Sequence, residues 1–112
     1  MTIENIGYIL EVLKAGSISA AATKLFMSQP LLSQKIRSIE QELDIVIFNR
    51  YSTPISLTYA GEVFVRYAEE IIRSKTNLCR ELADMKEEQM GRLRIAIPTH
   101  RALYTFAKLL AA

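Results

Sequence analysis

The sequence predicts a mainly α fold, with three short helices, a small β-hairpin and then one long helix. Apolar residues recur at intervals of three and four over most of the chain, which is the spacing of amphipathic helices. Hydroxyl residues stand where these patterns begin, as N-caps do, and one short stretch has the period of a strand. With 112 residues, 50% of them hydrophobic and 23% charged, the chain is long enough for one domain with a core and hardly for two.

The first predicted helix begins after Thr2, an N-cap residue, and ends at Gly16, which tolerates the left-handed conformation of a helix end. Apolar residues between them fall at i, i+3, i+4 and i+7, on one face of a helix. They are Ile6, Ile9, Leu10 and Leu13. We expect this helix to support the rest of the domain.

The second predicted helix runs from Ile18 to about Leu25, with Ser17 as its N-cap. Three consecutive alanines in it leave room for another helix to cross closely. The corner that follows, Phe26 and Met27, contains no Gly. One residue of the corner must therefore accept a tight backbone conformation without the freedom of Gly.

The third predicted helix begins after Ser28 and carries Pro30 in its first turn, where the missing N–H costs little. At 100° per residue, Gln34 and Arg37 project almost opposite its apolar stripe. That stripe consists of Leu32, Ile36, Ile39 and Leu43. A helix with one buried stripe and a polar outward face of this kind fits a groove of DNA.

A small hairpin is predicted after the third helix. Residues 45–50 have the pattern of a strand, residues 51–54 that of a turn, and residues 55–57 that of a short return strand. Because a hairpin of so few residues is not stable alone, it must pack against the helices.

The long helix is predicted from Tyr59 to Met90, with Thr58 as its N-cap and Gly91 as its end. It would be about 48 Å long, more than a domain of this size can cover. Its apolar stripe therefore needs a partner, and the same stripe in a second copy is the one we favour over an intramolecular seam. The expected dimer interface comprises Phe64, Ala68, Ile71, Leu78, Leu82 and Met85.

Beyond Gly91, residues 92–98 have the pattern of a strand and the rest of the chain a helical composition, which together resemble the opening of an α/β unit. We expect three parts. Residues 1–58 form the helical domain with its hairpin, residues 59–90 the long helix, and residues 91–112 the beginning of a further domain.

Charge distribution is more informative than the net charge of +2. From Val12 to Ile39 the chain contains no Asp or Glu, whereas Lys14, Lys24, Lys35 and Arg37 lie in that interval. A local excess of positive charge favours binding to a phosphate backbone.

The sequence offers little support for an enzyme, because it has no Gly-rich phosphate loop, no nucleophile with a base and no cluster of metal ligands. Its one cysteine, Cys79, excludes an intrachain disulfide. No stretch approaches the length of an apolar membrane span. We expect a cytoplasmic protein with no cofactor in this chain and no membrane partner.

Five segments together resemble the N-terminal part of a LysR-type transcriptional regulator: AGSISAAATKLFMSQPLLSQKIRSIEQEL, IFNR, LTYAG, the long helix and GRLRIAIP. The resemblance implies a winged helix-turn-helix, in which the hairpin is the wing, and a linker helix that pairs two chains. It also implies promoter DNA as a partner, a homodimer or tetramer, and a C-terminal domain outside this chain that binds a small-molecule effector.

The resemblance further implies that the third helix meets DNA and that the wing meets a phosphate. The DNA-binding residues expected on this basis are Ser28, Gln29, Pro30, Ser33, Gln34, Arg37 and Arg50. The chain departs from the family at Asp44, where a helix-ending Gly is usual, and in residues 51–54, which lack the usual Gly and additional Arg. A winged helix that serves only protein–protein assembly is the alternative.

Overall fold

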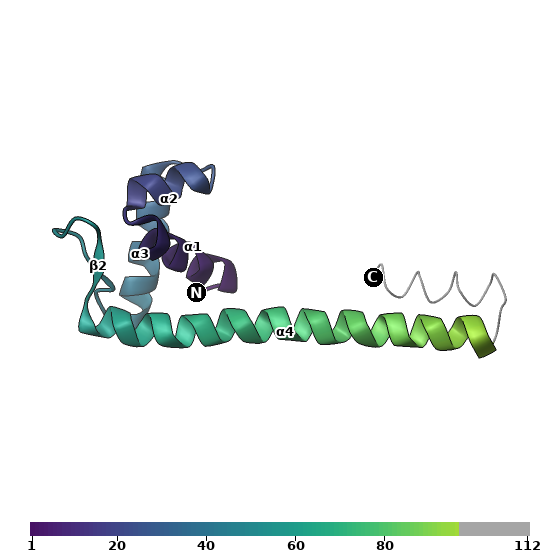
Figure 1. Ribbon diagram of the computed structural model, residues 1–112. Coiled ribbons are helices and arrows are strands. Elements are labelled where there is room, and N and C mark those ends of the chain that lie inside the picture. Colours follow the sequence, from purple (N-terminus) through teal and green to yellow (C-terminus); the bar gives the residue numbers. More distant parts are fainter. Residues whose placement is uncertain (97–112) are drawn as a thin grey trace. The chain divides into compact units, whose positions relative to one another are not determined.

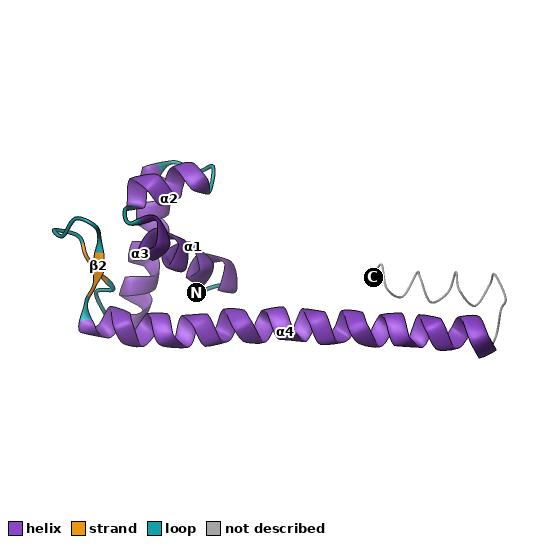
Figure 2. Ribbon diagram, viewed as in Figure 1, coloured by secondary structure: helices purple, strands orange, loops and turns teal. Residues whose placement is uncertain are grey.

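The computed structural model describes residues 1–96 as four helices and a two-stranded antiparallel sheet (Figures 1 and 2), which confirms the predicted mainly α class. By its contacts the chain divides into two units, Met1–Arg73 and Ser74–Ala112. The elements are α1 (Ile3–Ala15), α2 (Ile18–Lys24), α3 (Gln29–Leu43), β1 (Phe48–Asn49), β2 (Ser56–Leu57) and α4 (Tyr59–Ala96).

The three short helices begin at the predicted caps. The Oγ1 atom of Thr2 accepts a hydrogen bond from the N–H of Asn5 at 3.1 Å. Ser17 and Ser28 accept equivalent bonds from the N–H groups three residues later, at 3.0 and 3.2 Å. Gly16 ends α1 with φ of 87°, in the left-handed region that Gly tolerates.

Two corners have a left-handed residue that is not Gly. Phe26 has φ of 56° between α2 and α3, and Asp44 has φ of 53° at the end of α3. Both outcomes agree with the sequence, which has no Gly at either corner. Beyond Asp44, the N–H of Ile45 donates to the carbonyl oxygen of Glu40 at 3.0 Å, so the last turn of α3 is closed in spite of the missing Gly.

The core lies where α1, α2 and α3 meet the first strand. Its buried residues are Ile9, Val12, Ala21, Ala22, Leu32, Ile36, Ile39, Ile47 and Phe48. The predicted stripe of α3 is buried except at its last member, because the 38% exposed side chain of Leu43 lines an open apolar hollow instead. The prediction that Leu43 belongs to the buried stripe is wrong for this reason.

The strands of the wing are shorter than the predicted 45–50 and 55–57. Phe48 pairs with Leu57 and Asn49 with Ser56, and the ladder has no further pair. The backbone before Phe48 has other partners: the N–H of Ile47 donates to a carboxylate oxygen of Glu40, and its carbonyl accepts from Thr58. The return segment is tied to α1, because the N–H of Ile55 donates to the carbonyl oxygen of Gly16 at 2.9 Å.

Helix α4 continues past the predicted end at Gly91 as far as Ala96, so the prediction of a strand from residue 92 is wrong for residues 92–96. A strand needs a neighbour to bond its backbone, whereas a helix satisfies its own. One Gly inside a helix costs only about 1 kcal/mol relative to Ala, which a helix of 38 residues tolerates. The rest of the predicted strand, and the helical segment after it, lie outside the described residues.

The start of α4 is packed directly against the backbone of Ile47. The N–H of Thr58 donates to the Ile47 carbonyl oxygen at 2.9 Å, and the Thr58 Oγ1 caps α4 by accepting from the N–H of Gly61 at 3.0 Å. A Cβ atom on Gly61 would lie 2.0 Å from that same carbonyl oxygen. Only Gly fits at this position without displacing the backbone.

Helices α1 and α2 are joined by an ion pair between Glu11 and Lys24, with the Lys24 Nζ 2.6 Å from Oε1 of Glu11. The close contact with the Lys24 ammonium holds the pKa of the Glu11 carboxyl below its usual value of 4.5, against the opposite effect of desolvation. The charges of Lys24 and Lys14 lower this pKa further.

We predict that Gly61→Ala destabilises the domain by more than about 2 kcal/mol. The added Cβ atom would overlap the Ile47 carbonyl oxygen, so the backbone must shift to make room for it. Gly7→Ala is the matched control, since a Cβ there meets nothing within 4 Å and Ala favours a helix by about 0.5 to 1 kcal/mol. Urea unfolding followed by circular dichroism measures both. Equal stability of the two variants would contradict the close packing at Ile47.

We predict that Lys24→Met lowers the free energy of unfolding at neutral pH and has a smaller effect in acid. The pKa of Glu11 is lower in the folded state than its ordinary value, so the ion pair stabilises the fold fully at pH values above the unfolded-state pKa. This stabilisation is lost as the pH falls through the folded-state pKa. Thermal unfolding at several pH values measures the difference between variant and parent. Lys86→Met, on exposed α4, is expected to give a difference that does not change with pH.

Candidate nucleic-acid interface

The outward face of α3 carries the residues that the sequence analysis singled out. Gln34 and Arg37 are exposed on the side of the helix that points away from the buried Leu32 and Ile36, and Gln29 is exposed in the first turn. Ser28 and Pro30 are also exposed at the beginning of α3, and Ser33 is half-buried. These residues make up the first turn and the outward side of α3, which together we call the α3 face.

The chemistry of the α3 face matches what a DNA groove presents. A glutamine amide donates and accepts at once, as a bidentate bond to the N6 and N7 atoms of adenine requires. Gln29 and Gln34 both offer such amides to solvent. Arg37 lies farther along the same helix, and among the described residues no carboxylate pairs with it.

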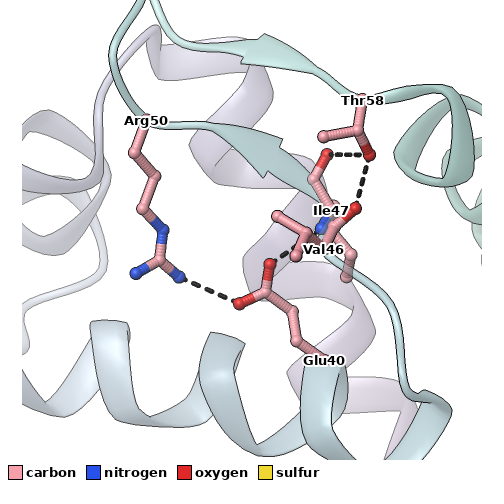
Figure 3. A network of polar contacts seen from close by, with 5 residues as sticks. All are labelled: Glu40, Val46, Ile47, Arg50 and Thr58. Atoms are coloured by element: carbon pink, nitrogen blue, oxygen red, sulfur yellow. Dashed lines mark hydrogen bonds and ion pairs between the residues drawn. The ribbon is translucent and has the colours of Figure 1, made fainter.

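Arg50 follows β1 in the wing, and the structure places its side chain against α3. Its Nη2 atom donates to Oε1 of Glu40 at 3.0 Å (Figure 3). A groove of about 530 Å³ between α3 and the wing is lined by Arg37, Glu40 and Arg50, together with Tyr51. The two arginines expected to meet DNA thus share one groove.

Glu40 is a residue of this site that the sequence analysis did not single out. It belongs to α3, and its carboxylate is used by two groups of the segment that enters the wing, the N–H of Ile47 and the guanidinium of Arg50. The available signal was weak: a Glu in the helix and an Arg ten residues later, whose meeting depends on the turn between them.

Part of the positive charge predicted for this side of the molecule is neutralised. Lys24 pairs with Glu11, which precedes the acid-free interval in sequence but lies beside it in space. The Nζ atom of Lys35 lies 5.8 Å from the ring centre of Tyr8, a cation–π distance. Arg37 is left as the cation of that interval that faces outward from α3.

Two exposed aromatic residues flank the α3 face and were not singled out from the sequence. Phe26, at the left-handed corner before α3, is 97% exposed, and Tyr51 in the wing is fully exposed. The turn that carries Tyr51 is stabilised by a local hydrogen bond, in which the N–H of Tyr51 donates to Oδ1 of Asn49 at 3.3 Å. Ser52 adds bonds to the backbone of Asn49 and to the hydroxyl of Ser56.

The apolar residues of α4 expected at a dimer interface fall into two groups. Ala68 is buried within the chain, and Phe64 is half-buried against the core. The others are exposed by 39% to 57%, and the described residues do not cover them; they are Ile71, Leu78, Leu82 and Met85. Tyr59 and Tyr67 on the same helix are also exposed and were missed.

An apolar hollow of about 460 Å³ lies beside the first turns of α4. Phe64, Ala68 and Ile71 line it from α4, Ile6 from α1 and Leu43 from the end of α3.

Within residues 1–96, no helix has the length and hydropathy needed to span a membrane.

A family model described as bacterial regulatory helix-turn-helix protein, lysR family, matches residues 3–62. Similar curated proteins include the uncharacterised HTH-type regulator YcgK of Bacillus subtilis, 36% identical over 98% of this chain and 34% of that protein. The regulator MetR of Haemophilus influenzae is 36% identical over 82% of this chain and 30% of its own length. The chain thus spans about a third of the relatives that it matches.

Solved structures of this fold include the BenM DNA-binding domain in complex with benA site 1 DNA, with a TM-score of 0.72 and 29% identity over 76% of this chain and 96% of that one. The CbnR DNA-binding domain in complex with DNA has a TM-score of 0.66 and 30% identity, over 76% and 99%. Sequence and fold therefore agree, and the chain belongs to the LysR family of bacterial regulatory helix-turn-helix proteins.

Proposed function

We propose that this chain is the DNA-binding part of a transcriptional regulator and that it binds double-stranded promoter DNA through the α3 face. The observation that carries the proposal is the exposure of Gln34 and Arg37 on the side of α3 away from its buried stripe, with Gln29 exposed in the first turn. The BenM and CbnR DNA-binding domains, which have the same fold, were solved on DNA.

Base recognition falls to the amides in this proposal. Gln29, at the first position of α3, and Gln34 read adenine edges in the major groove, where a good bidentate pair is worth about 1 to 3 kcal/mol of discrimination. The ring of Pro30 contacts a thymine methyl group, and Ser33 binds a base or a phosphate. Arg37 and Arg50 bind phosphates, which orient the helix without reading sequence.

A second copy of the chain is the proposed occupant of the exposed apolar residues on α4. Leu78, Leu82 and Met85 recur on one side of the helix, and a surface of this kind on a soluble protein indicates an interface. One recognition helix covers only a few base pairs, so two helices held at a fixed spacing are needed for useful affinity. We propose a homodimer, or a tetramer made of two such dimers.

Regulation is proposed to depend on a part of the protein outside this chain. A full-length LysR-type regulator of Corynebacterium glutamicum with bound effector Arg has a TM-score of 0.70 and 25% identity, and this chain covers 30% of it. By analogy, a small-molecule effector binds beyond the DNA-binding part. We assign this chain no cofactor and no catalytic activity, and we propose the cytoplasm as its location.

The alternative, a winged helix that only assembles with proteins, predicts no binding to promoter DNA at low salt. It is less favoured because the α3 face carries amides and an arginine without a carboxylate partner among the described residues.

We predict that Gln34→Ala reduces the preference for operator over random DNA by about 1 to 3 kcal/mol.

We also predict that Arg37→Ala weakens binding to operator DNA and to random DNA alike, and that it lowers the slope of log affinity against log salt concentration by about 1 per protomer. Fluorescence anisotropy with DNA upstream of the protein's own gene measures both effects at several salt concentrations. Gln89→Ala, an exposed glutamine on α4, is the control. Unchanged binding in both α3 variants would contradict the proposed interface.

We predict that Leu78→Glu converts a dimer into a monomer, because a charge on the apolar stripe must be desolvated to pair. Sedimentation velocity measures the change in mass, and operator affinity falls with it. Asn77→Glu adds the same charge one residue away, at an exposed position off the stripe, and is expected to remain dimeric. A wild-type chain that sediments as a monomer at micromolar concentration would contradict the dimer.

A further inference from the structure

Glu40 joins α3 to the wing through both of its carboxylate oxygens. Oε2 accepts the backbone N–H of Ile47 at 2.7 Å, and Oε1 accepts from Nη2 of Arg50 at 3.0 Å. Figure 3 shows the Arg50 side chain extending from the wing toward the helix, where Glu40 meets it. Because the Glu40 side chain is only 11% exposed, the carboxylate has little freedom to move.

The Arg50 guanidinium is consequently held in one place while most of it stays available. Its side chain is 35% exposed and lines the groove between α3 and the wing, as Arg37 does from the helix side. A guanidinium has five N–H donors in a fixed fork and is well matched to phosphate. The bond to Glu40 uses the Nη2 end, so other donors remain for an acceptor in the groove.

We propose that Glu40 is a positioning residue for DNA binding. It holds the Arg50 guanidinium in advance, with its remaining N–H donors directed to a phosphate of the DNA backbone in the groove between α3 and the wing. The inference rests on the proposed function and adds to it a residue that does not itself touch DNA. Ordering a long side chain before binding removes that entropic cost from the binding step.

An opposing effect makes the sign of a substitution informative. The negative charge of Glu40 repels a nearby phosphate, so its removal strengthens binding if charge alone matters. Glu40→Gln removes the charge and also one of two acceptors, because an amide has a single oxygen. If that oxygen keeps the N–H of Ile47, the amide NH₂ faces Arg50 and releases it. Positioning therefore predicts weaker binding in spite of the lost negative charge.

The test is a double-mutant cycle on the whole chain with Glu40→Gln, Arg50→Ala and the double variant. Because a phosphate contact is independent of sequence, a fluorescein-labelled duplex of mixed sequence at low salt is a sufficient probe. We expect Glu40→Gln to weaken binding about three- to tenfold, the range for ordering one long side chain, with an unchanged salt slope. Arg50→Ala lowers the slope by about 1 per protomer, and in its background Glu40→Gln causes no further weakening.

Glu42→Gln is the matched control, since it removes a charge from the same helix at a residue that pairs with the chain's amino terminus instead of Arg50. It is expected to leave binding unchanged or slightly tighter. Tighter or equal binding by Glu40→Gln overturns the inference, as does an equal loss in the Arg50→Ala background, which would indicate a general loosening of the wing. A wild-type chain that does not bind the duplex overturns the proposed function itself.

A measurement on the unaltered chain covers the case in which Glu40→Gln does not fold. The guanidinium signals of Arg50 in ¹⁵N NMR spectra report whether the group rotates freely. We expect restricted rotation before DNA is added, as for a guanidinium fixed by a carboxylate. Free rotation in the absence of DNA would overturn the proposed ordering by Glu40.

Discussion

The backbone of Ile47 is the point at which the helical core, the wing and the long helix are joined. Its N–H is bound by Glu40 of α3, and its carbonyl oxygen accepts from both the N–H and the hydroxyl of Thr58. The absence of a side chain at Gly61 lets α4 begin directly against that carbonyl. The start of α4 is therefore fixed against the core by a few hydrogen bonds to the backbone of one residue.

Local features of the fold were predictable because their causes are local. Ser17 and Ser28 cap helices through atoms three residues away, and the absence of Gly at the two corners required the left-handed backbones found at Phe26 and Asp44. The α3 face was predictable for the same reason, since helical periodicity alone determines which side chains oppose a buried stripe. Its role in binding DNA stays a prediction.

Features that depend on distant residues were not predictable in the same way. The interval without acids suggested a positive surface, but folding brings Glu11 to Lys24 and so neutralises one of its cations. The strand pattern before Phe48 was overridden because Glu40 and Thr58 bind that backbone. Helix α4 passes Gly91 because a strand there requires a neighbour, which the described residues do not supply.

The wing is fastened at both of its ends, by Glu40 and Thr58 at Ile47 and by the Gly16 carbonyl at Ile55. Two residue pairs are therefore enough to keep its strands together, although an isolated hairpin of that length would not persist. The tip between the strands contributes little to the stability of the fold. A substitution at the tip leaves both of these anchors in place, so the wing can acquire new contacts without loss of its two-pair ladder.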